Sequence, residues 1–217
     1  MSLKIYSDCL KAIPKAVIFD TDNTLYHYNP PHAAAMTAVE KKACQILGIQ
    51  SVDFQEAFAK ARSETKKRLG ATASSHSRLL YFQRTIEYLG MRTQLLLTLD
   101  LEQTYWRTFL SEVRLFPEVR EFVQDLKSAG IKTAIITDLT AQLQFRKIIY
   151  FGLDDVFDYV VTSEEAGLDK PAPIAFNIAM EKLNTNTDET WLIGDNVKAD
   201  IQGAKSFGLT ALQKLHV

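Results

Sequence analysis

Short apolar runs that alternate with helical patterns constrain the fold of this chain more than any other feature. One run comes early, and four come late: they occupy residues 15–20, 133–137, 159–162, 190–194 and, more weakly, 210–213. A short, nearly continuous apolar run that ends in a polar residue is typical of a buried parallel strand. Because helical patterns lie between the late runs, we expect an α/β fold with a doubly wound, Rossmann-like sheet.

The expected helices of the late part have recognisable ends. Apolar residues at helical spacing predict helices at residues 117–129, 141–151, 172–183 and 198–207. Glycine follows three of these helices directly, at Gly130, Gly152 and Gly208. Glycine in that place is typical of a helix C-terminus, because it adopts the left-handed conformation without strain.

The middle of the chain has a different character. Between about residues 32 and 113 no segment has a strand pattern, and Ala, Glu, Lys, Leu and Gln dominate. Four helices are expected, at residues 33–47, 52–69, 77–89 and 94–110. We therefore expect an α/β core formed by residues 1–26 and 113–217, interrupted after its first strand by a helical cap domain at residues 27–112.

The composition excludes several classes of protein. The chain has 217 residues, of which 47% are hydrophobic and 24% charged, and its net charge is −1. Disorder requires fewer apolar residues or more net charge, and a nearly neutral chain has no overall attraction for nucleic acid. Cys9 and Cys44 are too far apart in the sequence to form a metal-binding pair, and two cysteines are too few for a disulfide framework. No apolar run is long enough for a signal peptide or a membrane-spanning helix. We expect a cytoplasmic protein with no nucleic-acid or membrane partner, and leave its oligomeric state open.

Polar side chains follow three of the expected strands, at the point where each strand ends. In an open α/β sheet the active crevice lies at the carboxyl ends of the strands, so these side chains should share one rim. One lysine lies in a loop that directly precedes an expected helix. The residues concerned are Asp20, Asp22, Thr24, Thr137, Asp138, Lys170, Asp195 and Asp200.

Each of these segments also has an ordinary structural explanation. Asp20–Thr24 could be a turn and a helix cap, Thr137 an N-cap, and Lys170 a solvated loop lysine. Taken together, however, they place several carboxylates at one rim, and carboxylates at such density repel unless a cation compensates them. Oxygen ligands without Cys or His nearby favour Mg²⁺.

The order of these motifs resembles the haloacid dehalogenase-like superfamily. Its members carry D-x-D-x-T, a Ser or Thr at a strand end, a Lys, and an acidic G-D-x(3 or 4)-D motif. The matching residues are Asp20, Asp22 and Thr24, then Thr137, then Lys170, then Asp195 and Asp200. The helical insert resembles the C1-type cap of the family. One departure is Asp138, where members often have Asn or Gly.

The resemblance implies roles for the acidic residues. Asp20 would attack phosphorus to give an aspartyl-phosphate, and Asp22 would protonate the leaving oxygen and then activate water. Mg²⁺ would be held by the Asp20 and Asp195 carboxylates and by the Asp22 backbone carbonyl. Asp200 would act beside these ligands or through water.

The resemblance also implies how the phosphoryl group is held. Thr137 and Lys170 would bind its oxygens, Lys170 as a point charge suited to phosphate. Thr24 would support the neighbouring acidic groups.

Asp22 separates the branches of the superfamily. Its dehalogenases lack an acid two positions after the nucleophile, so a phosphatase acting on a small soluble organic phosphate, sugar-like or nucleotide-like, is favoured. A phosphomutase keeps both aspartates and remains an alternative. A third possibility is a non-catalytic binding or regulatory protein with this fold. The complete set of motif residues argues against it.

In the helical insert, His76 and Arg78 are candidate substrate contacts. They stand in a polar loop that opens an expected helix. Helix capping and a solvated face are the alternative explanation, and the commoner one for such residues.

Overall fold

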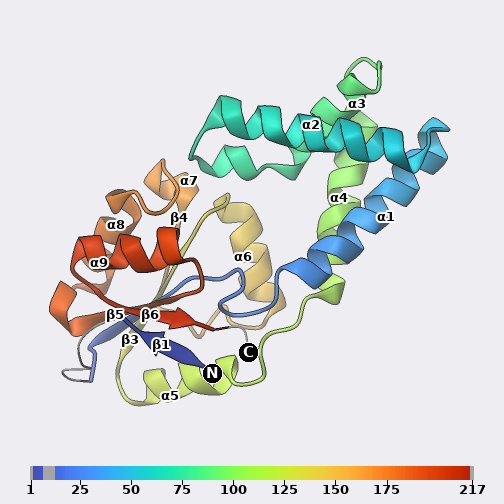
Figure 1. Cartoon of the computed structure of the whole chain (residues 1–217). Coiled ribbons are helices and arrows are strands. Elements are labelled where there is room, and N and C mark those ends of the chain that lie inside the picture. Colours follow the sequence, from blue (N-terminus) through green and yellow to red (C-terminus); the bar gives the residue numbers. More distant parts are fainter. Residues whose placement is uncertain (1, 7–12, 216–217) are drawn as a thin grey trace. The chain divides into compact units, whose positions relative to one another are not determined.

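A six-stranded sheet forms the centre of the α/β part of the chain. The computed structural model describes residues 2–6 and 13–215 (Figure 1). Cys9 lies outside these residues, and Cys44 is a free thiol. The strands are β1 (Leu3–Ile5), β2 (Ala16–Phe19), β3 (Lys132–Thr137), β4 (Tyr159–Thr162), β5 (Thr190–Gly194) and β6 (Thr210–Lys214). The five apolar runs of the sequence are thus confirmed as strands.

The strand order is β1-β6-β5-β2-β3-β4, and every pairing is parallel except that of β1 with β6. Strand β1 was not predicted, because its three residues are too few to show a pattern. Strand β2 lies in the middle, where Phe19 is level with Ile135 of β3 and with Ile193 of β5. The three strands end within two residues of one another, so the polar residues that follow them leave the sheet at one edge.

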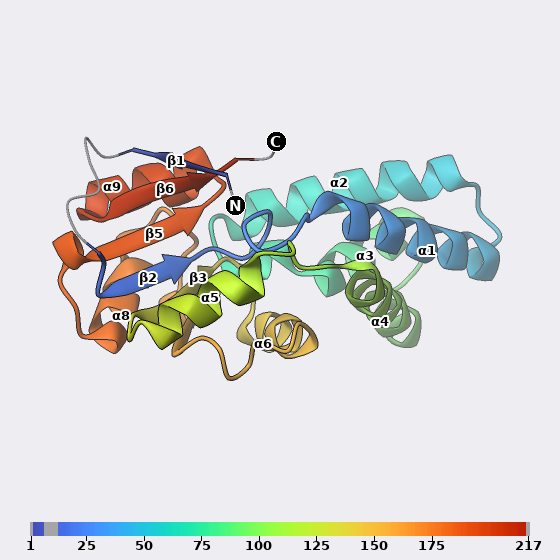
Figure 2. The same cartoon turned by 90° about the horizontal axis from the view of Figure 1, so that it is seen from below.

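Helices cover both faces of the sheet, which explains why β2 is apolar throughout. Ala16 and Ile18 belong to a buried cluster with Phe176 of α8. Phe19, on the opposite face, places its ring centroid 6.1 Å from that of Phe122 in α5. Figures 1 and 2 show α5 on one face and α8 and α9 on the other. The helices are α5 (Val119–Ser128), α6 (Ala141–Tyr150), α7 (Ser163–Ala166), α8 (Pro173–Leu183) and α9 (Gly203–Phe207).

The helix expected at residues 198–207 has an irregular first half. Val197–Gln202 forms a π-helical turn, and only Gly203–Phe207 is α-helical. Asn196 organises this turn: its carbonyl accepts from the backbone N–H groups of both Asp200 and Ile201, and its side chain accepts from Lys198 and Ala199. The widened turn places Asp200 in the interior, where it is 1% exposed.

Four helices form a separate unit. They are α1 (Asn29–Leu47), α2 (Ser51–Leu69), α3 (Arg78–Tyr88) and α4 (Leu95–Glu112), with a 3₁₀ turn at Ala73–His76. Helix α1 packs on α4 and α2 on α3 around an aromatic core that includes Phe54, Phe82 and Tyr105. The chain divides into two compact units: Met1–His27 with Arg114–Val217 (the α/β unit), and Tyr28–Val113 (the helical unit). In the described part of the chain, no helix combines the length and the apolar character needed to span a membrane.

Candidate active site

Asp20 stands immediately after the central strand and is held there by its neighbours. Its backbone N–H donates to the Ile193 carbonyl at 2.9 Å, and Thr24 Oγ1 donates to Asp20 Oδ2 at 3.1 Å. The intervening turn closes through bonds from the N–H groups of Thr24 and Leu25 to the Thr21 carbonyl. Thr24 is therefore a hydrogen-bond support for the Asp20 carboxylate.

Lys170 links two carboxylates. Its Nζ donates to Asp20 Oδ1 and Asp200 Oδ1, both at 2.6 Å, and to the Ile136 carbonyl at 3.1 Å. Burial alone would lower the pKa of Lys170, but the charges of Asp20 and Asp200 outweigh it and raise that pKa well above its usual value. Lys170 is therefore a charged lysine that stands between the two carboxylates, at the carboxyl end of the sheet.

Burial acts on Asp20 in the opposite sense. It raises the pKa of Asp20 well above its usual value, against the lowering effect of Lys170, and the neighbouring charge of Asp200 adds to the rise. The carboxyl groups thus resist ionising together, as expected where acids share a site with little solvent.

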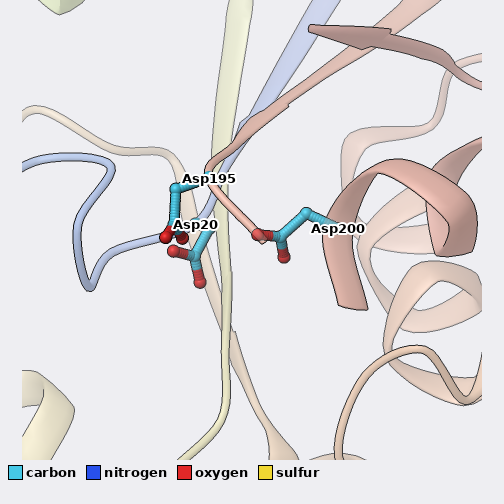
Figure 3. Close-up of side chains that lie close together, drawn as sticks. All are labelled: Asp20, Asp195 and Asp200. Carbon is cyan, nitrogen blue, oxygen red and sulfur yellow. The ribbon is translucent and has the colours of Figure 1, made fainter. Parts of the chain in front are cut away.

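Three carboxylates meet beside this lysine. One ligand oxygen from each of Asp20, Asp195 and Asp200 lies within 4.8 Å of the others. Figure 3 shows the Asp20 and Asp195 carboxylates close together, with Asp200 reaching toward them from its helical segment. Burial, and then the charge of Asp200, raises the pKa of Asp195 to about 6. This donor set contains only oxygen and concentrates negative charge, so it suits a hard divalent cation.

Gly194 leaves the space that Asp200 occupies. A Cβ built on Gly194 would lie 2.5 Å from the side-chain atoms of Asp200, closer than such atoms can approach. Asp200 Oδ2 also accepts from the Asn196 backbone N–H at 2.9 Å. The end of β5 and the π-helical turn therefore fix Asp200 between them.

Thr137 ends β3 within a small network of side chains. Its Oγ1 lies 2.8 Å from Thr21 Oγ1 and accepts a hydrogen bond from Gln144 Nε2 at 2.6 Å. Gln144 and Thr21 together fix the position of the Thr137 hydroxyl. Asp138, the departure from the family pattern, accepts from the Lys170 backbone N–H at 3.0 Å. It thus helps to fix the loop that carries Lys170.

Asp22 is held by two residues that sequence reasoning missed. Lys147 Nζ of α6 lies 2.7 Å from Asp22 Oδ1, and the Tyr26 hydroxyl donates to the same oxygen. The Lys147 side chain is 3% exposed, whereas that of Asp22 is 39% exposed. The sequence did contain a signal, because Gln144 and Lys147 interrupt the buried stripe of α6 at helical spacing.

His76 and Arg78 lie in the helical unit. Ser77 Oγ caps α3 by accepting from the Leu80 N–H at 3.3 Å, so the capping interpretation is correct for this loop. Arg78 nevertheless is not a solvated residue: it donates to the His76 carbonyl at 2.8 Å and to the Tyr28 hydroxyl.

Comparison with known proteins agrees with this geometry. The family model of the haloacid dehalogenase-like hydrolases matches residues 14–208. The chain is 39% identical to the ribulose-1,5-bisphosphate 5-phosphatase of Halopiger xanaduensis, over 89% of this chain and 82% of that protein. It is 29% identical to the glyceraldehyde 3-phosphate phosphatase of Methanocaldococcus jannaschii, over 93% and 85% of the two chains.

A solved structure leads to the same conclusion. The crystal structure of a haloacid dehalogenase-like phosphatase from Thermococcus onnurineus superposes with a TM-score of 0.70 at 26% identity, covering 90% of this chain and 84% of that one. The chain belongs to the haloacid dehalogenase-like hydrolases, and within them it is a phosphatase.

Proposed function

We propose that the protein is a Mg²⁺-dependent phosphatase that hydrolyses a small sugar phosphate through an aspartyl-phosphate at Asp20. The observation that carries the proposal is the Asp20 carboxylate at the end of the central strand, with Lys170 on one oxygen and Asp195 beside it. The choice of a sugar phosphate as substrate rests on the names of the two relatives, both of which are phosphatases of sugar phosphates.

Asp20, Asp195 and the Asp22 backbone carbonyl would hold Mg²⁺, which neutralises phosphoryl charge when bound. Lys170 and the Thr137 hydroxyl bind phosphoryl oxygens. An Asp20 oxygen attacks phosphorus while Asp22 gives a proton to the leaving oxygen of the sugar. Asp22 then takes a proton from the water that cleaves the aspartyl-phosphate, which releases phosphate and restores Asp20.

The alternative of a phosphomutase uses the same residues up to the aspartyl-phosphate. In that case the phosphoryl group returns to a sugar hydroxyl rather than to water. Both relatives are named as phosphatases, which favours hydrolysis. The two reactions differ in their product, so assays of free phosphate separate them.

The test uses purified protein with an aryl phosphate and a panel of sugar phosphates. We expect phosphate release with Mg²⁺, and its loss in excess EDTA after removal of bound metal. Asp20→Asn keeps the shape of the side chain but removes the nucleophile, so turnover should fall by several orders of magnitude, roughly 10³-fold or more. Near-normal turnover by a folded Asp20→Asn protein would contradict the proposal.

A further inference from the structure

Helix α6 carries two buried polar side chains on one face. Gln144 and Lys147 are three residues apart, a spacing that makes side chains neighbours on the surface of an α-helix. Lys147 binds Asp22, the residue assigned to proton transfer, and Gln144 binds Thr137, which is assigned to the phosphoryl group. One helix of the α/β unit thus contacts both groups, although neither of its two side chains belongs to the motif set.

Gln144 pairs only part of its amide. Its Nε2 donates to Thr137 Oγ1 at 2.6 Å, whereas its buried Oε1 has no hydrogen-bond partner among residues 2–6 and 13–215. A buried amide oxygen without a partner destabilises a fold, because it gives up its bonds to water and gains none in return. An apolar side chain, like that of buried Ile148 on the same helix, would fill the space without this loss. The contact with Thr137 is the feature that sets Gln144 apart from such a residue.

The same Thr137 oxygen has a second neighbour. It lies 2.8 Å from Thr21 Oγ1, and the Thr21 hydroxyl donates to Asp22 Oδ1 over a longer distance of 3.4 Å. Thr137, Thr21 and Asp22 therefore form a row of polar side chains. Gln144 binds one end of this row and Lys147 binds the other. Because one helix holds the row at both ends, the Thr137 oxygen has little freedom to move.

We propose that Gln144 is a positioning residue for phosphoryl binding: it fixes the Thr137 hydroxyl for a phosphoryl oxygen, and the fold loses stability in return. Groups that are already in place bind a phosphoryl group more tightly than groups that must first be ordered. The inference rests on the proposed function, in which Thr137 binds the phosphoryl group. It adds a residue outside the motifs to that function, and it predicts opposite effects on stability and on binding.

The first experiment replaces Gln144 with methionine, which keeps the length of the side chain and removes the amide. We expect the melting temperature of the full chain to rise by roughly 2–4 °C in Gln144→Met, because the unpaired oxygen is gone. Affinity for inorganic phosphate, measured by calorimetry with Mg²⁺ present, should at the same time fall about tenfold, since the Thr137 hydroxyl is no longer held in place. A glutamine with a merely structural role would lower the melting temperature when it is replaced.

Two variants on the same helix serve as controls. Gln142→Met makes the same change at an exposed position of α6 and should alter neither quantity. Lys147→Met acts on Asp22, so it should lower kcat for p-nitrophenyl phosphate and leave phosphate affinity near that of the wild type. The second experiment uses Thr137→Val, which lacks the hydroxyl that Gln144 holds. Adding Gln144→Met to this variant should weaken phosphate binding little further.

Three results would overturn the inference. They are a melting temperature that does not rise in Gln144→Met, an unchanged phosphate affinity in that variant, and the full loss of affinity in the Thr137→Val background as well. Failure of the proposed function is distinguishable, because it appears as a wild type that releases no phosphate from p-nitrophenyl phosphate, whereas the calorimetric measurement requires no turnover. A wild type that binds no phosphate would overturn both.

Discussion

At the scale of single residues, Lys147 is the least expected member of the site. It brings a buried ammonium group to Asp22, the residue assigned to proton transfer, and Tyr26 binds the same oxygen. Both contacts restrict the rotation of the Asp22 side chain. Lys147 is therefore a positioning residue, acting on the reaction through Asp22.

Replacing Lys147 should affect the chemical step more than substrate binding. We expect Lys147→Met to lower kcat for an aryl phosphate by about 10–100-fold, part of what a well-placed proton-transfer group contributes, with little change in KM. Lys147→Arg should recover part of the loss. Lys127→Met, on α5, is the control, because the Lys127 side chain donates to the Asp155 carbonyl at an exposed site away from Asp22. Equal loss of kcat in the Lys127 variant would remove the special role of Lys147.

Gly194 gives a second prediction at this scale. In Gly194→Ala the added methyl group must displace Asp200, and with it one partner of Lys170. We expect kcat to fall about tenfold or more, since small displacements of positioning groups are costly. If the methyl group acts through Asp200, the double variant with Asp200→Ala should cost little more than Asp200→Ala alone. Additive losses in this cycle would contradict that explanation.

The candidate site was largely predictable, because its residues sit where strand patterns end. Asp20, Thr137 and Asp195 each follow an apolar run, and sheet geometry brings such positions together. Lys147 and Tyr26 could not be placed in the same way. Their contacts with Asp22 depend on the packing of α6 and on the turn after β2, which periodicity does not specify.

At the scale of elements, all the long helices and the five parallel strands could be predicted from apolar spacing and terminal glycines. The π-helical turn at Val197–Gln202 could not, since a widened turn has nearly the same spacing of side chains as an α-helix. This irregularity matters for the site, because it places Asp200 against Gly194.

Helices α2, α3 and α4 each contribute one group near His32 of α1. They are Arg62 of α2, Arg78 of α3 and Tyr105 of α4, whose hydroxyl lies 2.7 Å from His32 Nδ1. We expect His32 to titrate near pH 4, measured by NMR of labelled imidazole, and Arg62→Ala to raise that pKa because it removes one repelling charge. A pKa of His32 that is unchanged by Arg62→Ala would place Arg62 away from it.

The same shift has a consequence for stability, with a definite sign. The folded protein holds His32 neutral, so the unfolded chain binds a proton more readily. The contribution of His32 to the free energy of unfolding is present above its ordinary pKa, about 6.5. It is lost as the pH falls toward about 4.

At the scale of the whole molecule, metal binding should make the folded protein more stable. Asp20, Asp195 and Asp200 repel one another in the interior, and a divalent cation would relieve that repulsion. Binding of Mg²⁺ to the folded chain should raise the free energy of unfolding by about 2.7 kcal/mol at a hundredfold excess over Kd. Addition of Mg²⁺ should therefore raise the melting temperature of the full chain. Asp195→Asn should weaken this response, measured by calorimetry with and without Mg²⁺. A wild-type melting temperature indifferent to Mg²⁺ would contradict the metal assignment.

In the sequence, the whole helical unit lies between the central strand β2 and the two strands that pair with it, β3 and β5. This order matters during synthesis. Ala16–Phe19 leaves the ribosome early and is apolar on both faces, but β3 begins at Lys132 and β5 at Thr190. The helical unit, Tyr28–Val113, is synthesised as a whole before β3 and β5, so it can fold before either partner strand exists. The nascent chain can therefore carry a folded helical unit while β2 is still unpaired and prone to aggregate, so its yield in cells should depend on chaperones that bind such segments.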